Sequence, residues 1–128
     1  MNLHVLPMPP LRLVQRDLVA RAKAVDYLRR IARAVEEGEI AADAVLIVTP
    51  YYNKPGRRGL VLHFGAIAAA TELPVMLYNV PSRTSLDLDP RIAREVGEQN
   101  ATVVALKEAN ASPDRVRSVV EASGLAVF

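Results

Sequence analysis

Three continuous apolar runs, each followed at once by polar and aromatic residues, constrain this chain more than any other feature. They cover residues 44–48, 74–78 and 102–106, and two of them are rich in valine. Hydrophobicity that is continuous rather than alternating is typical of strands buried on both faces of a parallel sheet. A fourth run covers residues 125–128. The sequence therefore predicts four parallel strands.

The segments between these runs carry the signals of helix ends. Asp-Pro at residues 89–90 and Ser-Pro at residues 112–113 each combine an N-cap residue with a proline at the first helical position. Gly124 is placed to end the second of these helices. Two further helices are predicted over residues 18–37 and 59–71.

Alternating strands and helices are typical of parallel α/β folds. Thr49, Tyr78 and Lys107 mark successive strand ends at intervals of 29 residues, close to the roughly 31 residues per unit of a (β/α)8 barrel. No run is followed by a glycine-rich phosphate loop, which favours the barrel over a doubly wound sheet. We predict a TIM-barrel domain over residues 18–128, a central partial barrel of about four βα units, after an unassigned leader over residues 1–17. Four strands do not close such a barrel, so either the chain is incomplete or it associates with another copy or another piece.

The composition excludes several classes of protein. The chain has 16 Lys+Arg and 14 Asp+Glu, a balance that does not indicate a nucleic-acid partner. Cysteine is absent, which excludes disulfides and cysteine-ligated metals and suits a reducing compartment. No apolar run approaches the roughly 20 residues of a membrane span. We therefore predict a cytoplasmic protein without a membrane partner and without a metal site.

Residues that carry chemistry follow the predicted strands, where parallel α/β folds gather their active sites. Lys107 is either a desolvated amine that attacks a carbonyl carbon or a strand-end lysine that reaches solvent. Tyr78 is either a proton relay or a core aromatic, and Arg83 is either a fork for a substrate carboxylate or a solvated loop residue. Tyr51 and Tyr52, adjacent in one loop, indicate an interface as much as a catalytic site.

Three segments at these strand ends resemble successive signatures of the dihydrodipicolinate synthase family, whose members are pyruvate-dependent class I aldolases. They are Thr-Pro-Tyr-Tyr-Asn-Lys-Pro at residues 49–55, Leu-Tyr-Asn-Val-Pro-Ser-Arg-Thr at residues 77–84 and Leu-Lys-Glu-Ala at residues 106–109. They occur in the family's order and close to its spacing. Asn79 and Arg83 resemble the synthase branch of the superfamily rather than the N-acetylneuraminate lyase branch.

The resemblance implies a role for each candidate residue. Lys107 matches the lysine that forms an imine with pyruvate, and Tyr78 matches the tyrosine that shuttles protons. Tyr52 matches a tyrosine that reaches across a tight dimer interface, which implies a homo-oligomer, a dimer or tetramer. Arg83 matches the arginine that holds the carboxylate of aspartate semialdehyde, and Tyr51 matches a residue lining an inhibitory lysine pocket. No metal or organic cofactor is implied, because the protonated imine is itself the electron sink.

The predicted function is condensation of pyruvate with L-aspartate semialdehyde in lysine (diaminopimelate) biosynthesis. Two departures from the family pattern bear on it: the Thr-Thr-Gly-Glu segment that completes the proton relay is not in this sequence, and Ser85 stands where the family has glycine. Two alternatives stay open, namely a related aldolase or dehydratase acting on sugar acids, and a truncated non-catalytic remnant or interaction subunit. We expect the isolated chain to be inactive.

Overall fold

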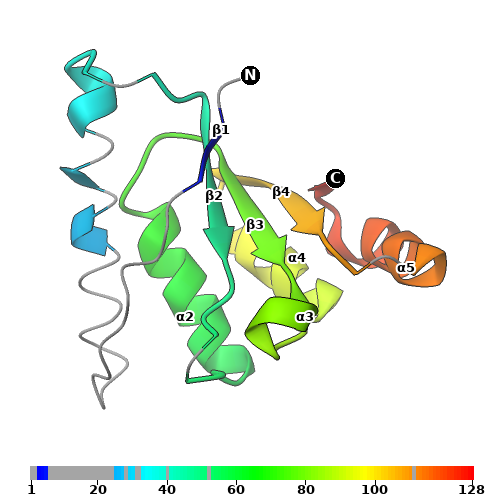
Figure 1. Cartoon of the computed structure of the whole chain (residues 1–128). Helices are drawn as coiled ribbons and strands as arrows, with labels where there is room; N and C mark the ends of the chain where they lie inside the picture. The colour runs from blue at the N-terminus through cyan, green and yellow to red at the C-terminus, as the bar shows by residue number, and fades with distance from the viewer. Residues whose placement is uncertain are drawn as a thin grey trace.

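One five-stranded parallel sheet forms the centre of the fold (Figure 1). The computed structural model describes residues 3–5, 25–27, 29–30, 33–39, 41–51, 53–110 and 112–128. The strand order is β1-β2-β3-β4-β5, so neighbours in the chain are neighbours in the sheet. This order is that of a barrel wall, whereas a doubly wound sheet reverses its order at a switch point. The strands are β1 (Leu3–Val5), β2 (Ala44–Val48), β3 (Val75–Asn79), β4 (Val103–Glu108) and β5 (Ala126–Val127).

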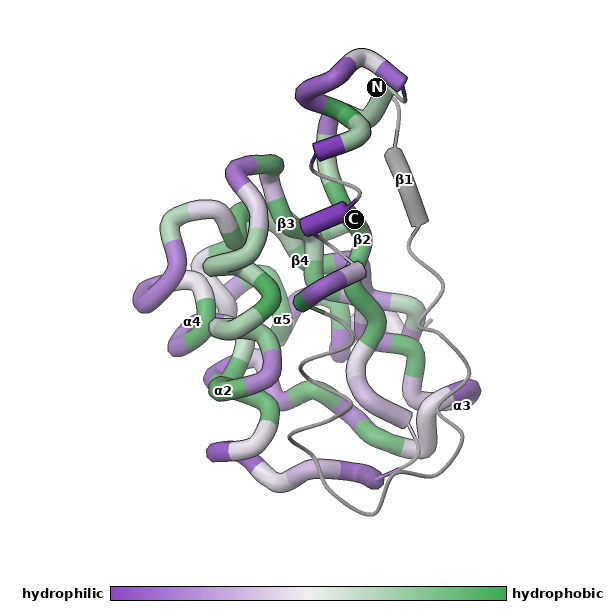
Figure 2. Tube along the Cα trace, turned by 90° about the vertical axis from the view of Figure 1, so that its left-hand side faces the viewer, coloured by the Kyte–Doolittle hydropathy of each residue, from purple (hydrophilic) through white to green (hydrophobic). Residues whose placement is uncertain are grey.

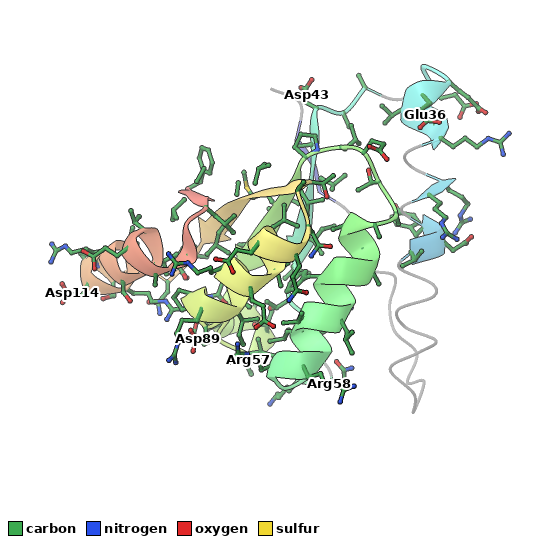
Figure 3. All side chains as sticks on the ribbon, turned by 180° about the vertical axis from the view of Figure 1, so that it is seen from behind. Glu36, Asp43, Arg57, Arg58, Asp89 and Asp114 are labelled. Atoms are coloured by element: carbon green, nitrogen blue, oxygen red, sulfur yellow. The ribbon has the colours of Figure 1, made fainter. Side chains whose placement is uncertain are left out.

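Three helices cover one face of this sheet. They are α2 (Arg57–Ala68), α4 (Pro90–Gln99) and α5 (Pro113–Ser123). Seen from behind, α2 and α4 lie in front of the strands, and α5 lies beside α4 at the edge of the sheet (Figure 3). A short helix, α3 (Pro81–Thr84), follows the end of β3. Within the described part of the chain, no helix is both long enough and apolar enough to cross a bilayer.

The helix ends are set by the residues that the sequence indicates. The Asp89 carboxylate accepts a hydrogen bond of 2.9 Å from the backbone N–H of Arg91 at the start of α4. The Ser112 hydroxyl accepts one of 3.5 Å from the N–H of Arg115 at the start of α5. Gly124 ends α5 with φ at 70°, in the left-handed region that glycine adopts without steric cost. The predicted caps are confirmed.

The main hydrophobic core lies between the helices and the sheet. Apolar residues run along β2, β3 and β4, where the chain trace is green in Figure 2. Side chains alternate between the two faces of a strand, so a second, smaller cluster forms on the face away from the helices. The main core includes Val45, Leu77 and Leu106 from the strands and Phe64 and Val96 from the helices. The smaller cluster consists of Leu46, Met76 and Ala105, with Tyr78 packed against it.

The predicted parallel α/β architecture is confirmed, with one strand more than expected. The predicted runs lie within two residues of β2, β3, β4 and β5. Strand β1 lies in the segment that the sequence left unassigned, and it pairs in parallel with β2, so the sheet has five strands rather than four. Its three residues are too few to show a hydrophobic pattern of their own. Of the helix predicted over residues 18–37, residues 25–27, 29–30 and 33–36 are described and are helical.

The left-handed backbone conformation of Ser85 leads to a prediction about stability. It ends α3 with φ at 52°, a left-handed conformation that costs a residue with a side chain about 1–2 kcal/mol. Glycine avoids this cost but loses about 0.4–1 kcal/mol through the larger entropy of the unfolded chain. We therefore expect Ser85→Gly to raise the free energy of unfolding by roughly 0.5–1 kcal/mol in urea denaturation followed by circular dichroism. Ser85→Ala keeps the Cβ and should stay within about 0.5 kcal/mol of the parent; a glycine variant no more stable than the alanine variant contradicts the expectation.

Asp89 gives a second test, through pH. Hydrogen bonds from the Arg91 side chain and from its backbone N–H hold the pKa of the Asp89 carboxyl below its usual value. A lowered folded-state pKa contributes stability above the unfolded-state pKa, and this contribution is lost as the pH falls through the folded-state pKa. Asp89→Asn keeps a cap but removes the charge, so its stability deficit at neutral pH should shrink as the pH falls below about 4.

The control for this test is Ser112→Ala, because a hydroxyl cap does not titrate in this range. Its deficit should stay constant between neutral pH and pH 3 to 4, roughly the range in which carboxyl groups titrate. Unfolding free energies from urea curves at each pH check both variants. An Asp89→Asn deficit that is equally constant contradicts the assignment of the charge to the stability of α4.

Candidate active site

The carboxyl ends of the parallel strands meet at one edge of the molecule. Asp43, just before β2, lies at the opposite edge from Arg57 and Asp89, which lie where α2 and α4 begin (Figure 3). At the carboxyl edge, Tyr78 of β3 and Lys107 of β4 are direct partners in the strand register. The Lys107 Nζ atom lies over the Tyr78 ring, 4.9 Å from its centroid. The structure therefore brings the predicted lysine and the predicted tyrosine into contact.

This pair occupies the face of the sheet that the helices leave open. Met76 and Ala105, each two residues earlier on the same strands, belong to the smaller hydrophobic cluster of that face. Tyr78 is half-buried and Lys107 is exposed. The sequence left two alternatives open for Lys107, a desolvated amine and a strand-end lysine that reaches solvent. In the described part of the chain its side chain is exposed, since α2, α4 and α5 all cover the other face.

Two of the other predicted site residues lie at the same edge as this pair. Arg83 is exposed on α3, the helix that directly follows β3, and so lies at the same edge as the pair. Tyr51 follows the end of β2 and is 38% exposed, which also places it at this edge. Tyr52 lies outside the described residues. The edge thus gathers an amine, two phenols and a guanidinium.

Directly behind the pair, on the face that the helices cover, lies a buried carboxylate. The Glu108 side chain is 0% exposed. The Asn79 amide donates to both of its oxygens, at 3.1 and 3.0 Å, and the Asn110 backbone N–H donates at 2.9 Å. The Arg115 Nε donates at 3.3 Å and supplies the compensating charge. A buried carboxylate with these partners is fully paired, which offsets the cost of removing it from water.

The same network holds the segment between β3 and α4. The Asn79 side-chain oxygen accepts from the Leu88 N–H at 2.9 Å, and its amide also donates to Asp87 at 2.8 Å. The Arg115 guanidinium donates to Asp87 and to the Leu88 carbonyl, both at 2.8 Å. Asn79 and Arg115 therefore connect the ends of β3 and β4, the loop before α4, and α5 through one set of hydrogen bonds.

This network is the part of the site that the sequence analysis missed. A signal for half of it was available, because Asn79 and Glu108 are separated by the same 29 residues as Tyr78 and Lys107. Residues at that spacing are register partners on β3 and β4. Arg115 has no comparable signal, since it reaches Asp87 across 28 residues of sequence from a helix whose exposed positions also carry arginine.

A sequentially ordered parallel sheet with helices on one face and reactive side chains at its carboxyl edge defines a partial (β/α)8 barrel. Comparison with known proteins refines this class. The model of the Dihydrodipicolinate synthetase family matches residues 25–128, and the chain belongs to that family. The resemblance seen in the three strand-end segments and the predicted fold class are both confirmed.

Individual relatives agree with this membership. The chain is 43% identical over 90 residues to a 4-hydroxy-tetrahydrodipicolinate synthase of Methanocaldococcus jannaschii, covering 70% of this chain and 31% of the relative. It is 36% identical over 112 residues to the synthase of Methanococcus aeolicus, covering 88% and 39%. A crystal structure of DHDPS from Cyanidioschyzon merolae with lysine bound superposes with a TM-score of 0.70 at 32% identity, covering 84% and 35%. The chain thus spans less than half the length of these relatives.

The buried network predicts a large cost for losing Asn79. Asn79→Ala removes two donors from the Glu108 carboxylate and the acceptor of the Leu88 N–H, so we expect the free energy of unfolding to fall by about 3 kcal/mol. Asn100→Ala is the matched control, because the Asn100 amide donates one bond of 2.8 Å to the Val96 carbonyl, and it should cost about 1 kcal/mol. Urea denaturation measures both, and equal costs contradict a special role for the network.

Proposed function

We propose that this chain carries the Schiff-base site of a pyruvate aldolase that condenses pyruvate with L-aspartate semialdehyde. The observation that supports the proposal is the Lys107 amine over the Tyr78 ring at the carboxyl edge of the sheet. Relatives are named 4-hydroxy-tetrahydrodipicolinate synthase, and one solved relative is a complex with pyruvate; aspartate semialdehyde is proposed from the family resemblance. The names favour the synthase over aldolases acting on sugar acids.

The proposed chemistry begins with the neutral amine of Lys107, which attacks the C2 carbonyl carbon of pyruvate. The resulting carbinolamine loses water to give a protonated imine, and loss of a proton from the methyl carbon gives an enamine. That carbon then attacks the aldehyde carbon of the second substrate, whose oxygen takes up a proton. The Tyr78 ring lies against the amine, and its hydroxyl is the group proposed to pass protons in these steps. Cyclisation onto the imine carbon releases the lysine.

The remaining residues have roles that follow from family membership. Arg83 is proposed to hold the carboxylate of aspartate semialdehyde, since its guanidinium offers a bidentate fork. Tyr51 is proposed to line a pocket for lysine, as one relative has lysine bound. Tyr52 is proposed to act across a subunit interface in a homo-oligomer.

These roles place the protein in lysine biosynthesis through diaminopimelate. A cytoplasmic location is part of the same proposal, because a chain without cysteine suits a reducing compartment.

Reductive trapping tests the site directly. The chain has three lysines, at positions 23, 54 and 107, so an adduct can be assigned by peptide mass spectrometry. Pyruvate with borohydride should convert the imine to a stable secondary amine that adds the mass of a reduced pyruvyl group to Lys107. Lys107→Arg keeps the charge but forms no imine, and it should lose the adduct.

Lys54 is the matched internal control. Like Lys107 it is exposed, and it lies in the loop that follows β2 at the carboxyl edge, so exposure and position alone would label both lysines. We expect at least about tenfold more adduct at Lys107 than at Lys54, because the Lys107 amine lies against the ring of Tyr78, the proposed proton relay. Lys54→Arg should leave trapping unchanged. Equal labelling of the two lysines in the folded chain rejects the proposed site.

A further inference from the structure

The ladder between β3 and β4 contains a register shift that bears on the site. Val75 pairs with Val103, but the next residue, Met76, pairs with Ala105. Val104 is therefore an extra residue in β4, a β-bulge, and its side chain is 47% exposed. A bulge changes which residues face each other in the rest of the ladder.

The contact between the lysine and the tyrosine depends on this shift. Without the bulge, the register of the Val75–Val103 pair would continue along the strands. Tyr78 would then lie opposite Leu106, and Asn79 opposite Lys107. With the bulge, Tyr78 pairs with Lys107 and Asn79 pairs with Glu108. Because side chains alternate between faces, a slip of one residue would also move Lys107 to the helix-covered face.

Backbone hydrogen bonds do not by themselves choose between these registers, since either one supplies a parallel ladder. The side chains do choose. Only the bulged register sets the Glu108 carboxylate against the Asn79 amide, with its two hydrogen bonds, and within reach of Arg115. In the alternative register Glu108 would leave its donors and lie on the other face, so Asn79 would lose two hydrogen bonds and Arg115 would lose its bond to a buried carboxylate, while their bonds to Asp87 would remain.

We propose that Glu108 is a positioning residue, which holds the bulged register of β4 through Asn79 and Arg115 and thereby presents the Lys107 amine at the Tyr78 ring. The value of this placement for imine formation rests on the proposed function, whereas the placement itself does not. Glu108 touches no reacting atom, because it points to the opposite face of the sheet from Lys107.

The placement is tested without pyruvate. In the whole chain labelled with ¹³C-lysine, the ε-CH2 resonance of Lys107 should show an upfield ring-current shift from Tyr78, with Lys107→Arg for assignment and Tyr78→Leu for the ring-free value. Glu108→Ala should lose most of this shift. Glu108→Gln keeps an acceptor for Asn79 and should retain part of it. Glu95→Ala is the matched control, because it removes a glutamate that pairs with Arg57 on the helix layer, and it should keep the shift of the parent.

The consequence is tested with pyruvate and borohydride. Glu108→Ala should lower the maximal trapping rate at Lys107 by about 10- to 100-fold, the effect of a misplaced reactive group, while the pyruvate concentration for half-maximal rate changes little. Glu108→Gln should lie between this variant and the parent, and Glu95→Ala should match the parent. Rates are compared after correction for the folded fraction from circular dichroism, so that a loss of stability alone does not register.

The outcomes separate the two proposals. A folded Glu108→Ala chain with the ring-current shift and trapping rate of the parent overturns the positioning role. If Glu108→Ala does not fold, Arg115→Lys decides, because it keeps the charge but not the fork; a partial loss of shift and rate supports the role, and parental values overturn it. A parent chain that shows the Glu108-dependent shift but no pyruvyl adduct refutes the proposed function and leaves the positioning role standing.

Discussion

The interaction on which the rest of this structure depends is the pairing of the buried Glu108 carboxylate. Removing a charge from water is costly unless hydrogen bonds and an opposite charge replace the lost solvation. Here the Asn79 amide, the Asn110 N–H and the Arg115 guanidinium do so together. Each of these donors lies on a different segment, so satisfying one carboxylate fixes the relative positions of β3, β4 and α5. The hydrogen bonds that the buried Glu108 carboxylate requires thus determine the geometry of the carboxyl edge.

The alternation of side chains along β3 and β4 places the reactive groups on the face opposite this network. Asn79 and Glu108 point toward the helices, and their chain neighbours Tyr78 and Lys107 point to the open face. The packed side carries the polar network and most of the core, so it supplies rigidity, while the open side carries the reactive groups. A group held by its neighbour's buried contacts loses little freedom when a substrate arrives, which is the usual advantage of placing reactive side chains at the ends of strands rather than in loops.

The sequence predicted the elements better than the contacts between them. Continuous apolar runs located four of the five strands, and the Asp89 and Ser112 caps located two helices, because these signals are local. The 29-residue spacing indicates the register at the ends of β3 and β4, but the bulge that produces it was not predictable, since nothing in the run containing Val104 marks it as the extra residue. Arg115 was missed for a similar reason: its role depends on residues that only the fold brings near.

The same separation of faces matters for the chemistry proposed for Lys107. An amine attacks a carbonyl carbon only when it is uncharged, and a carboxylate beside it would favour the charged form. Glu108 is next to Lys107 in sequence, yet its charge is directed to the opposite face and compensated there by Arg115. On the open face the Lys107 amine lies over the Tyr78 ring. Lys107 and Glu108 are therefore adjacent in sequence, but because side chains alternate along the strand, the amine and the carboxylate lie on opposite faces of the sheet.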